Sequence, residues 1–316
     1  MRLLSFIVRR LVAMVFILIG VAAITFLLVR LAPGDPVVTQ LGQHAGDAVA
    51  YKRIYHQMGL DAPLWRQFIT YAWNALHGDL GQSIIQLNTP VTDIIGQGLP
   101  ITLELGFLST VVALIWGVPL GVIAAVRHNK IIADNLNMGV MMALYSLPPF
   151  VIIPVVWLVF GISLRNTWFH LEVTGWDITN PRYWLAPVLV FAAGLAGFFA
   201  RSVRSFMLEE LTKDYVRTAR AKGMSERTVI YMHAMKNTLL PLASVLGPTI
   251  AFLVVGAFII EQTFSIPGVA NITVQSTLSN DYAVTMGTTL VLAAAVVVVN
   301  ALTDIFYTIA DPRVKL

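Results

Sequence analysis

The chain contains no cysteine among its 316 residues, and Asp, Glu, Lys and Arg together make up only 12% of it. The absence of cysteine excludes disulfide bonds, thiolate nucleophiles and cysteine-ligated metals. Soluble domains usually carry about 25% charged residues. Because 57% of the residues here are hydrophobic, a water-soluble fold would expose a large apolar surface. The composition therefore predicts a membrane protein whose apolar surface faces lipid.

The sequence also lacks the phosphate-binding pattern G-x-x-x-x-G-K-[ST] and the zinc-binding pattern H-E-x-x-H. Its six histidines are scattered over the loops between the apolar stretches. We therefore expect no ATP hydrolysis, no metal site and no cofactor in this chain itself.

Six apolar stretches are each long enough for a membrane-spanning helix, which needs about 20 residues. They lie at about 8–29, 99–126, 136–163, 184–203, 239–264 and 284–309. This pattern predicts an all-α fold with a single transmembrane domain over residues 1–316. A long outer loop would occupy residues 31–98 and an inner loop residues 204–238. In the second stretch, Gly117 and Gly121 form a G-x-x-x-G pair, which is either a site of close helix packing or a chance occurrence.

The first apolar stretch follows Arg2, Arg9 and Arg10, a pattern that secretory signal peptides share. The stretch is longer than the apolar part of a typical signal peptide. It ends in the turn-forming sequence L-A-P-G-D-P at residues 31–36, without a small-x-small cleavage pattern. We therefore favour an uncleaved first helix.

The distribution of basic residues predicts the orientation. If the N-terminus is cytoplasmic, the inner segments hold 15 of the 21 Lys and Arg residues. The outer segments hold the other six, which are Arg30, Lys52, Arg53, Arg66, Arg165 and Arg182. The positive-inside rule then places both termini in the cytoplasm.

The outer loop contains a stretch with apolar residues at helical spacing, Leu64–Leu76. An amphipathic helix of this kind is typical of a segment that lies in the membrane interface. We therefore predict a surface helix in the outer loop.

The inner loop has the pattern of a helix, a break and a second helix. Asp214 is a suitable N-cap for a helix over residues 215–222, and Gly223 stands where a left-handed C-terminal cap belongs. Ser225 would cap a second helix, which ends near Asn237.

The second inner helix would carry an apolar face made of Val229, Ile230, His233 and Ala234. One interpretation is a docking surface for a cytoplasmic partner, and the other is a solvated basic loop that only sets orientation. The capped break and the apolar face together favour the docking surface.

The stretch D-Y-V-R-T-A-R-A-K-G at residues 214–223 resembles the cytoplasmic "EAA" loop of ABC importer permeases in its peptide-transporter form. Arg217, Thr218 and Ala219 stand where the general loop has Glu-Ala-Ala, and the distance from Gly223 to Pro241 is longer than usual. Both departures are typical of the peptide and nickel branch. Similar matches run along the whole chain, at residues 31–36, 77–81, 261–268, 300–304 and 311–313.

The resemblance is closest to the first, B-type permease of the pair in dipeptide and oligopeptide importers of the bacterial plasma (inner) membrane. It implies the type I ABC importer permease fold and four kinds of partner: membrane lipid, a second permease, two cytoplasmic ATPases that bind ATP and Mg²⁺, and an extracytoplasmic solute-binding protein. It implies that the ATPases are contacted by Arg217, Thr218, Ala219, Gly223, Val229, Ile230 and His233. It further implies that Asp35, Glu261, Pro267 and Gly268 face the binding protein or a gate.

The substrate stays open, because this branch transports dipeptides, oligopeptides, nickel, glutathione and some sugars. A self-sufficient secondary transporter is the alternative function, and it would require internal repeats or ionisable groups near the membrane midplane. The sequence shows no clear repeat, and Glu104, Glu261 and Asp304 lie near the ends of the predicted spans. An intramembrane enzyme would require a nucleophile–base pair or a metal site within the spans, and the sequence shows neither.

Overall fold

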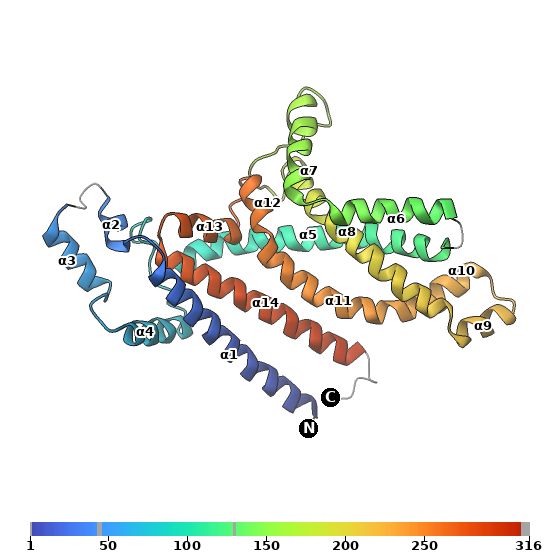
Figure 1. The fold of residues 1–316 in the computed structure, drawn as a ribbon, viewed down its shortest axis with the longest axis horizontal. Helices are drawn as coiled ribbons and strands as arrows, with labels where there is room; N and C mark the ends of the chain where they lie inside the picture. The colour runs from blue at the N-terminus through green and yellow to red at the C-terminus, as the bar shows by residue number, and fades with distance from the viewer. Residues whose placement is uncertain (1, 43–45, 129–130, 311–316) are drawn as a thin grey trace. The chain divides into compact units, whose positions relative to one another are not determined.

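A computed structural model describes residues 2–42, 46–128 and 131–310 of the chain, which are helical almost throughout (Figure 1). Over these ranges, the only β-pairing is one isolated bridge between Gln82 and Pro90. The all-α prediction is therefore confirmed.

In chain order the helices are α1 (Arg2–Leu31), α2 (Pro36–Leu41), α3 (Ala48–Gln57), α4 (Leu64–Leu76), α5 (Val91–Val126), α6 (Ile131–Ser146), α7 (Pro149–Val156), the π-helix η2 (Trp157–Ser163), α8 (Pro181–Leu211), α9 (Asp214–Ala221), α10 (Glu226–Thr228), the π-helix η3 (Val229–Ala234), α11 (Met235–Gly256), α12 (Phe258–Thr263), α13 (Val269–Leu278) and α14 (Tyr282–Ala310).

Among the residues that the structure describes, four helices are long and apolar enough to cross a membrane. Their apolar segments are Val8–Leu31, Val91–Val126, Pro181–Leu211 and Tyr282–Thr303. The 36 residues of α5 extend about 54 Å at 1.5 Å per residue, which exceeds the roughly 30 Å hydrocarbon core of a bilayer. These four helices match the first, second, fourth and sixth predicted spans.

The third predicted span, 136–163, is broken into three helical pieces. Helix α6 ends at Ser146, Leu147 and Pro148 form a joint, and α7 begins at Pro149 before continuing into η2. Neither proline has a backbone N–H, so neither can donate the hydrogen bond that would extend α6. The prediction of one continuous helix is therefore wrong here.

The fifth predicted span, 239–264, also differs from a single helix. Helix α11 tolerates Pro241 and Pro248 in its interior, and Ala257 separates it from α12. The segments α10, η3 and α11 follow one another without a gap. The second inner helix therefore does not end near Asn237 as predicted, because no breaking residue separates it from the apolar stretch.

The chain divides into two compact units. The first contains Met1–Thr102 and Pro267–Val298, and the second contains Leu103–Ile266 and Val299–Leu316. Helices α5 and α14 contribute residues to both units. A single transmembrane domain over the whole chain stays a prediction.

In the first unit, side-chain hydrogen bonds join segments that are far apart in the sequence. Asp281 is buried, and it accepts hydrogen bonds from Ser83 Oγ at 2.5 Å and the Ile84 N–H at 3.2 Å. The Val269 N–H donates to Thr102 Oγ1 at 2.9 Å. These bonds hold the segment around residue 83 against the start of α14, and the start of α13 against α5.

Helix α4 of the first unit has the bounds that its apolar spacing predicted. None of its residues is buried, and its exposed side chains include Trp65, Ile69 and Trp73. Exposed tryptophans are typical of membrane interfaces. The structure thus confirms the helix, while its position on a membrane stays a prediction.

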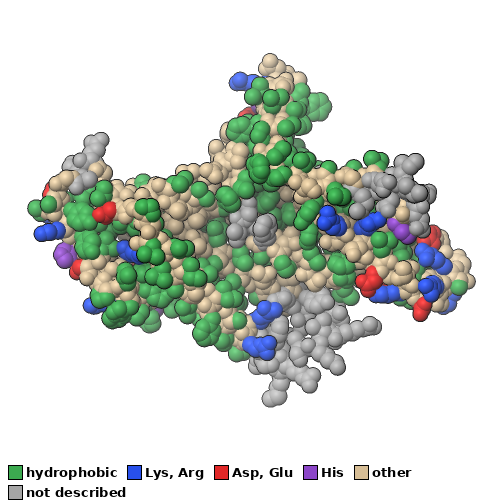
Figure 2. Space-filling model, in the orientation of Figure 1, with side chains coloured by type: hydrophobic (Ala, Val, Ile, Leu, Met, Phe, Trp, Pro, Cys, Tyr) green, Lys and Arg blue, Asp and Glu red, His purple; other side chains and the backbone are tan. Residues whose placement is uncertain are grey.

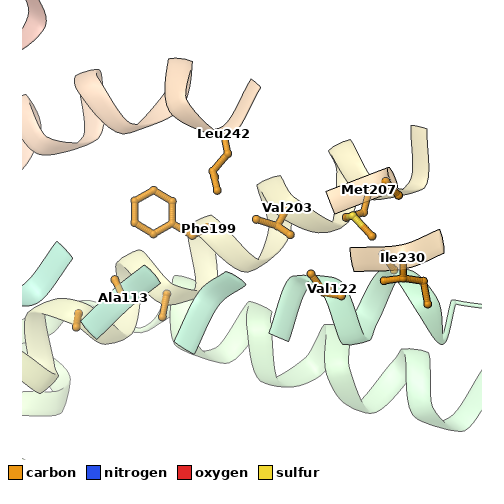
Figure 3. Packing of buried hydrophobic residues seen from close by; sticks show 11 residues of the cluster. Ala113, Val122, Phe199, Val203, Met207, Ile230 and Leu242 are labelled. Carbon is orange, nitrogen blue, oxygen red and sulfur yellow. The ribbon is translucent and has the colours of Figure 1, made fainter. Parts of the chain in front are cut away.

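The core of the second unit is assembled around α8 (Figure 3). Its residues Phe199, Val203 and Met207 are fully buried and pack with Val122 of α5 and Ile230 of η3. Leu242 of α11 belongs to the same cluster. The central helix of this unit is therefore covered by three different segments.

The Gly117 and Gly121 pair permits the closest approach of α5 to α8. A Cβ atom on Gly117 would lie 2.7 Å from the Ala196 carbonyl oxygen, and one on Gly121 would lie 2.6 Å from the Ala200 carbonyl oxygen. No larger residue fits at either position without a shift of the backbone. The close-packing interpretation of the G-x-x-x-G pair is therefore confirmed.

Candidate coupling site

The predicted docking hairpin begins one residue earlier than expected. Helix α9 starts at Asp214, and Lys213 is its N-cap, without a side-chain hydrogen bond. Asp214 is therefore a first-turn residue and not the N-cap. Its carboxylate still faces the positive end of the helix dipole, which stabilises an acidic residue at this position.

The break between α9 and α10 has the predicted geometry. Gly223 has a φ of +73°, a left-handed conformation that favours glycine, and its N–H donates to the Arg220 carbonyl oxygen at 2.9 Å. Ser225 caps α10 by accepting a hydrogen bond from the Thr228 N–H at 3.3 Å. Across the break, the Arg220 guanidinium contacts Glu226 at 2.7 Å. This pair lowers the pKa of Glu226 and raises that of Arg220.

Three of the residues expected to contact a partner are buried within the chain. Val229 is 0% exposed, and it packs with Val216 and Ala219 of α9. Ile230 is 7% exposed and packs into the α8 core. Ala219, Val229 and Ile230 therefore stabilise the hairpin from within. Another protein cannot reach them without moving α9.

The outer surface of the hairpin is formed by different side chains. Arg217, Thr218 and Gly223 are exposed, and His233 is half-buried. Tyr231 is 56% exposed and Met232 is 70% exposed. Figure 2 shows Lys, Arg, Asp and Glu side chains gathered over α9 and α10. The surface therefore combines exposed apolar groups with charges of both signs, as protein interfaces commonly do.

A buried carboxylate holds the base of the hairpin. Glu210, near the end of α8, contacts Lys213 Nζ at 2.5 Å and accepts a hydrogen bond from the Tyr215 hydroxyl. A side-chain hydrogen bond from Asn237 reaches the same group. The carboxylate raises the pKa of Lys213, and burial raises the pKa of Tyr215. This network connects α8, α9 and α11.

Glu210 was not among the functional residues predicted from the sequence. The spacing of Glu210 and Lys213, three residues apart, is a local signal for an ion pair on a helix. The contribution of Asn237 has no such signal, because it is distant in sequence. Only the fold brings Asn237 to the end of α8.

Two of the residues predicted to face a binding protein or gate occupy structural positions. Asp35 caps α2 through the Val37 N–H at 2.9 Å and accepts a hydrogen bond from the Tyr51 hydroxyl at 2.8 Å. Glu261 in α12 is 0% exposed, and its carbonyl oxygen accepts from the Ile266 N–H at 2.7 Å. Asp35 lies in the first unit and Glu261 in the second.

The other two residues lie together at the start of α13 in the first unit. Gly268 is buried, because α5 approaches closely at Gly98, where a Cβ atom would lie 3.3 Å from the Gly268 carbonyl carbon. Pro267 is exposed and lines a pocket of about 510 Å³. Nine of its fifteen lining residues are polar, namely Ser83, Gln86, Thr89, Gln97, Asn271, Gln275, Ser276, Ser279 and Asp281. Such a lining suits hydrogen bonding to another protein or a hydrated solute.

Long apolar helices together with a braced, charged hairpin define a membrane-embedded protein. Two family models match the chain and identify its family. The model for the inner membrane component of binding-protein-dependent transport systems matches residues 117–316. The N-terminal model for the membrane component of the same systems matches residues 3–106. The chain belongs to this family of inner-membrane transport components.

Individual relatives match along nearly the whole chain. The dipeptide transport system permease protein of Bacillus subtilis (strain 168) is 34% identical over 98% of both chains. The corresponding protein of Escherichia coli (strain K12) is 32% identical over 99% of both chains. A putative peptide transport system permease protein of Brucella abortus (strain 2308) is 36% identical over 98% of this chain and 99% of its own.

A solved structure has the same fold. A chain of the MetNI methionine ABC transporter in an inward-facing conformation aligns with a TM-score of 0.56 at 20% identity. The alignment covers 69% of this chain and 96% of the MetNI chain. At this identity the similarity establishes the ABC transporter permease fold.

Proposed function

We propose that this chain is a membrane-spanning permease subunit of an ATP-driven importer, and that it moves dipeptides or oligopeptides delivered by an extracytoplasmic solute-binding protein. The observation that carries this proposal is the full-length similarity to permeases named for dipeptide or peptide transport. The description of the matching family, as a component of binding-protein-dependent systems, supports the need for a delivery protein. The same similarity favours an importer subunit over a self-sufficient secondary transporter.

The proposed topology has six spans and two cytoplasmic termini. Every predicted span has a helical counterpart, although the third and fifth are interrupted. Helix breaks are tolerated at membrane depth where the backbone is buried in protein or lines an aqueous cavity. The excess of Lys and Arg in the inner segments supports the orientation.

The α9–η3 hairpin would transmit force from a cytoplasmic ATPase. Its exposed residues Arg217, Thr218, Tyr231 and Met232 would form the contact, and the buried Ala219, Val229 and Ile230 would hold the two segments together. Gly223 would set the turn and His233 would lie at the edge of the contact. ATP and Mg²⁺ would be bound by the ATPases, so this subunit would require no cofactor of its own.

On the outer side, residues around α13 would meet the binding protein. Pro267 is the exposed member of this set, and the polar pocket beside it offers hydrogen-bonding groups. Asp35, Glu261 and Gly268 would act by shaping the segments on either side, because all three are engaged in local structure.

Co-expression with a second permease, the ATPases and the binding protein tests this proposal. The wild-type chain should co-purify with the ATPases and support ATP-dependent peptide uptake. Thr218→Asp changes an exposed residue of the hairpin, and Thr167→Asp changes an exposed residue of the loop after η2 as its control. We expect Thr218→Asp to reduce ATPase attachment and uptake while membrane insertion is retained.

Two further variants test the interior of the hairpin. Ala219→Asp places a carboxylate in the apolar cluster with Val216 and Val229, and Gly223→Pro imposes a negative φ and removes the N–H that bonds to Arg220. Both should abolish uptake and leave the chain in the membrane. Uptake by the purified chain without any ATPase, or normal ATPase attachment in all three hairpin variants, would contradict the proposal.

A further inference from the structure

The second unit contains a pocket of about 690 Å³ that no predicted site uses. It is lined by three segments: the joint between α6 and α7, the middle of α8, and the part of α11 that contains Pro248. Its volume lies within the range of small-molecule binding sites. The pocket therefore occurs where two of the predicted spans depart from regular helix geometry.

Proline residues at this pocket leave main-chain acceptors without their usual donors. Pro149 has no N–H to offer the Tyr145 carbonyl, and Pro248 has none to offer the Ser244 carbonyl, four residues earlier in each case. Tyr145 and Ser244 both line the pocket. Within a membrane, such carbonyl groups require a hydrogen-bond donor, because lipid tails offer none.

The α8 residues that line the pocket include a group of apolar side chains. Val190 and Phe191 are buried, and Leu195 and Phe198 are half-buried beside them. The ring of Phe198 stacks against Tyr145 with centroids 6.3 Å apart. An occupant would thus meet a mostly apolar and aromatic lining that also includes Tyr145 and Ser244.

Two glycines of α8 lie at or near the pocket: Gly194 lines it, and Gly197 contacts Tyr145, which also lines it. Gly197 permits close contact between α6 and α8, because a Cβ atom there would lie 2.8 Å from the Tyr145 nitrogen. Gly194 lies one turn away on the same helix and lines the pocket itself. Because glycine has no side chain, a larger residue at Gly194 would add its side chain to the pocket lining.

We propose that this pocket binds the transported peptide during its passage, with an apolar or aromatic side chain against Phe191 and Phe198 and with main-chain N–H groups directed to the freed carbonyls of Tyr145 and Ser244. This inference rests on the proposed function. A peptide supplies both N–H donors for the freed carbonyls and an apolar side chain for the apolar lining. A lipid tail supplies the apolar contact but no N–H donor, so the freed carbonyls favour the peptide.

The absence of cysteine from the chain permits a direct occupancy experiment. Ser244→Cys places a thiol in the pocket, and Ser163→Cys places one outside it as a matched control. In the wild type both serines are exposed, and each donates its hydroxyl to a helix carbonyl, at 2.7 Å for Ser244 and 2.8 Å for Ser163. Each variant is assembled into the complete transporter, and the rate of alkylation of this chain is measured with and without a transported dipeptide during ATP turnover.

We expect the dipeptide to protect Ser244→Cys and not Ser163→Cys. At a peptide concentration ten times the Kd of the site, mass action slows the alkylation about tenfold. Equal rates with and without peptide at Ser244→Cys, in a transporter that imports the peptide, would overturn this inference and leave the proposed function intact. Failure of the wild-type transporter to import any peptide would instead refute the proposed function.

A second variant separates a binding role from general damage. Gly194→Leu adds a bulky side chain to the pocket lining, so uptake of a dipeptide with aromatic side chains should fall at least tenfold more than uptake of dialanine. Equal losses for both peptides would indicate a structural effect and contradict the proposed side-chain site. Protection of Ser244→Cys by a fatty acid, but not by peptide, would assign the pocket to lipid.

Discussion

The two compact units differ in the interactions that stabilise the interior of each. In the first unit, hydrogen bonds accepted by Asp281 and Thr102 connect segments separated by more than 160 residues. In the second unit, α8 packs closely against α5 and α6 at Gly117, Gly121 and Gly197. Large buried side chains such as Phe199 and Met207 fill the rest of that core.

This difference follows from the solvent that each region is proposed to meet. Lipid tails are as apolar as the helices themselves, so helices in a membrane associate through close packing of small residues. Segments outside the membrane can combine apolar clusters with polar joints, because water satisfies the groups that remain exposed. The first unit contains most of the proposed outer loop, and hydrogen bonds accordingly connect its segments.

The largest expected effect is at the close contact in the second unit. The double variant Gly117→Ala, Gly121→Ala should lower the free energy of unfolding by about 4 kcal/mol, since overpacking costs about 1–3 kcal/mol per site. Equilibrium unfolding in mixed detergent micelles measures this loss. Gly139→Ala is the matched control on α6, because nothing lies within 4 Å of its added Cβ atom. A double variant as stable as this control would refute the packing account.

The next largest effect is expected at the hydrogen bonds to Asp281 in the first unit. Asp281→Ala removes the acceptor for Ser83 and Ile84 and leaves both donors buried. We expect the free energy of unfolding to fall by about 3 kcal/mol, because hydrogen bonds to charged acceptors stabilise a fold more than hydrogen bonds to neutral ones. Asp177→Ala is the control, because that carboxylate caps only exposed local groups in the other unit. Equal stabilities for the two variants would show that these hydrogen bonds contribute little.

A smaller effect is expected at Thr102, which is 1% exposed. Thr102→Val keeps the shape of the side chain but leaves the Val269 N–H without this acceptor. The cost should be about 1.5 kcal/mol, the usual penalty for a buried donor that loses its acceptor. Hydrogen exchange at the Val269 amide measures it locally, with the exposed Thr277→Val as control. Unchanged protection of this amide would contradict the assigned bond.

The smallest effect concerns the exposed ion pair across the hairpin break. Arg220 lowers the pKa of Glu226, so the pair stabilises the folded hairpin above the unfolded pKa and loses that contribution as the pH falls through the folded pKa. Because both side chains are substantially exposed, the contribution should be below about 1 kcal/mol. Comparison of wild type with Glu226→Gln between neutral and acidic pH measures it. A stability difference that persists after protonation of Glu226 would rule out the electrostatic origin.

Several elements were predictable because their signals are local. The bounds of α4 follow from apolar spacing over 13 residues, and the break at Gly223 follows from glycine beside the capping residue Ser225. The long helices α1, α5, α8 and α14 follow from continuous apolar runs. Each of these features depends on residues within a few turns of one another.

Other features required the fold. The apolar face of Val229 and Ile230 was expected to be a contact surface, yet α9 and α8 cover it. The third span appeared continuous because Pro148 and Pro149 can be accommodated in a kinked membrane helix. Whether the two prolines kink or break the helix depends on how α6, α8 and α11 pack. The residues next to the prolines in the sequence do not determine that packing.

The sequence alone determined that this protein is helical, belongs in a membrane and carries a broken helical hairpin with a basic flank. These conclusions depend on composition and short-range periodicity, which act through the solvent and the local backbone. The tertiary structure alone decided which face of the hairpin is exposed, that Glu210 braces it, and that a pocket opens beside the interrupted helices. The physical reason is that burial and hydrogen-bond partnership arise from residues distant in sequence, and only packing brings those residues together.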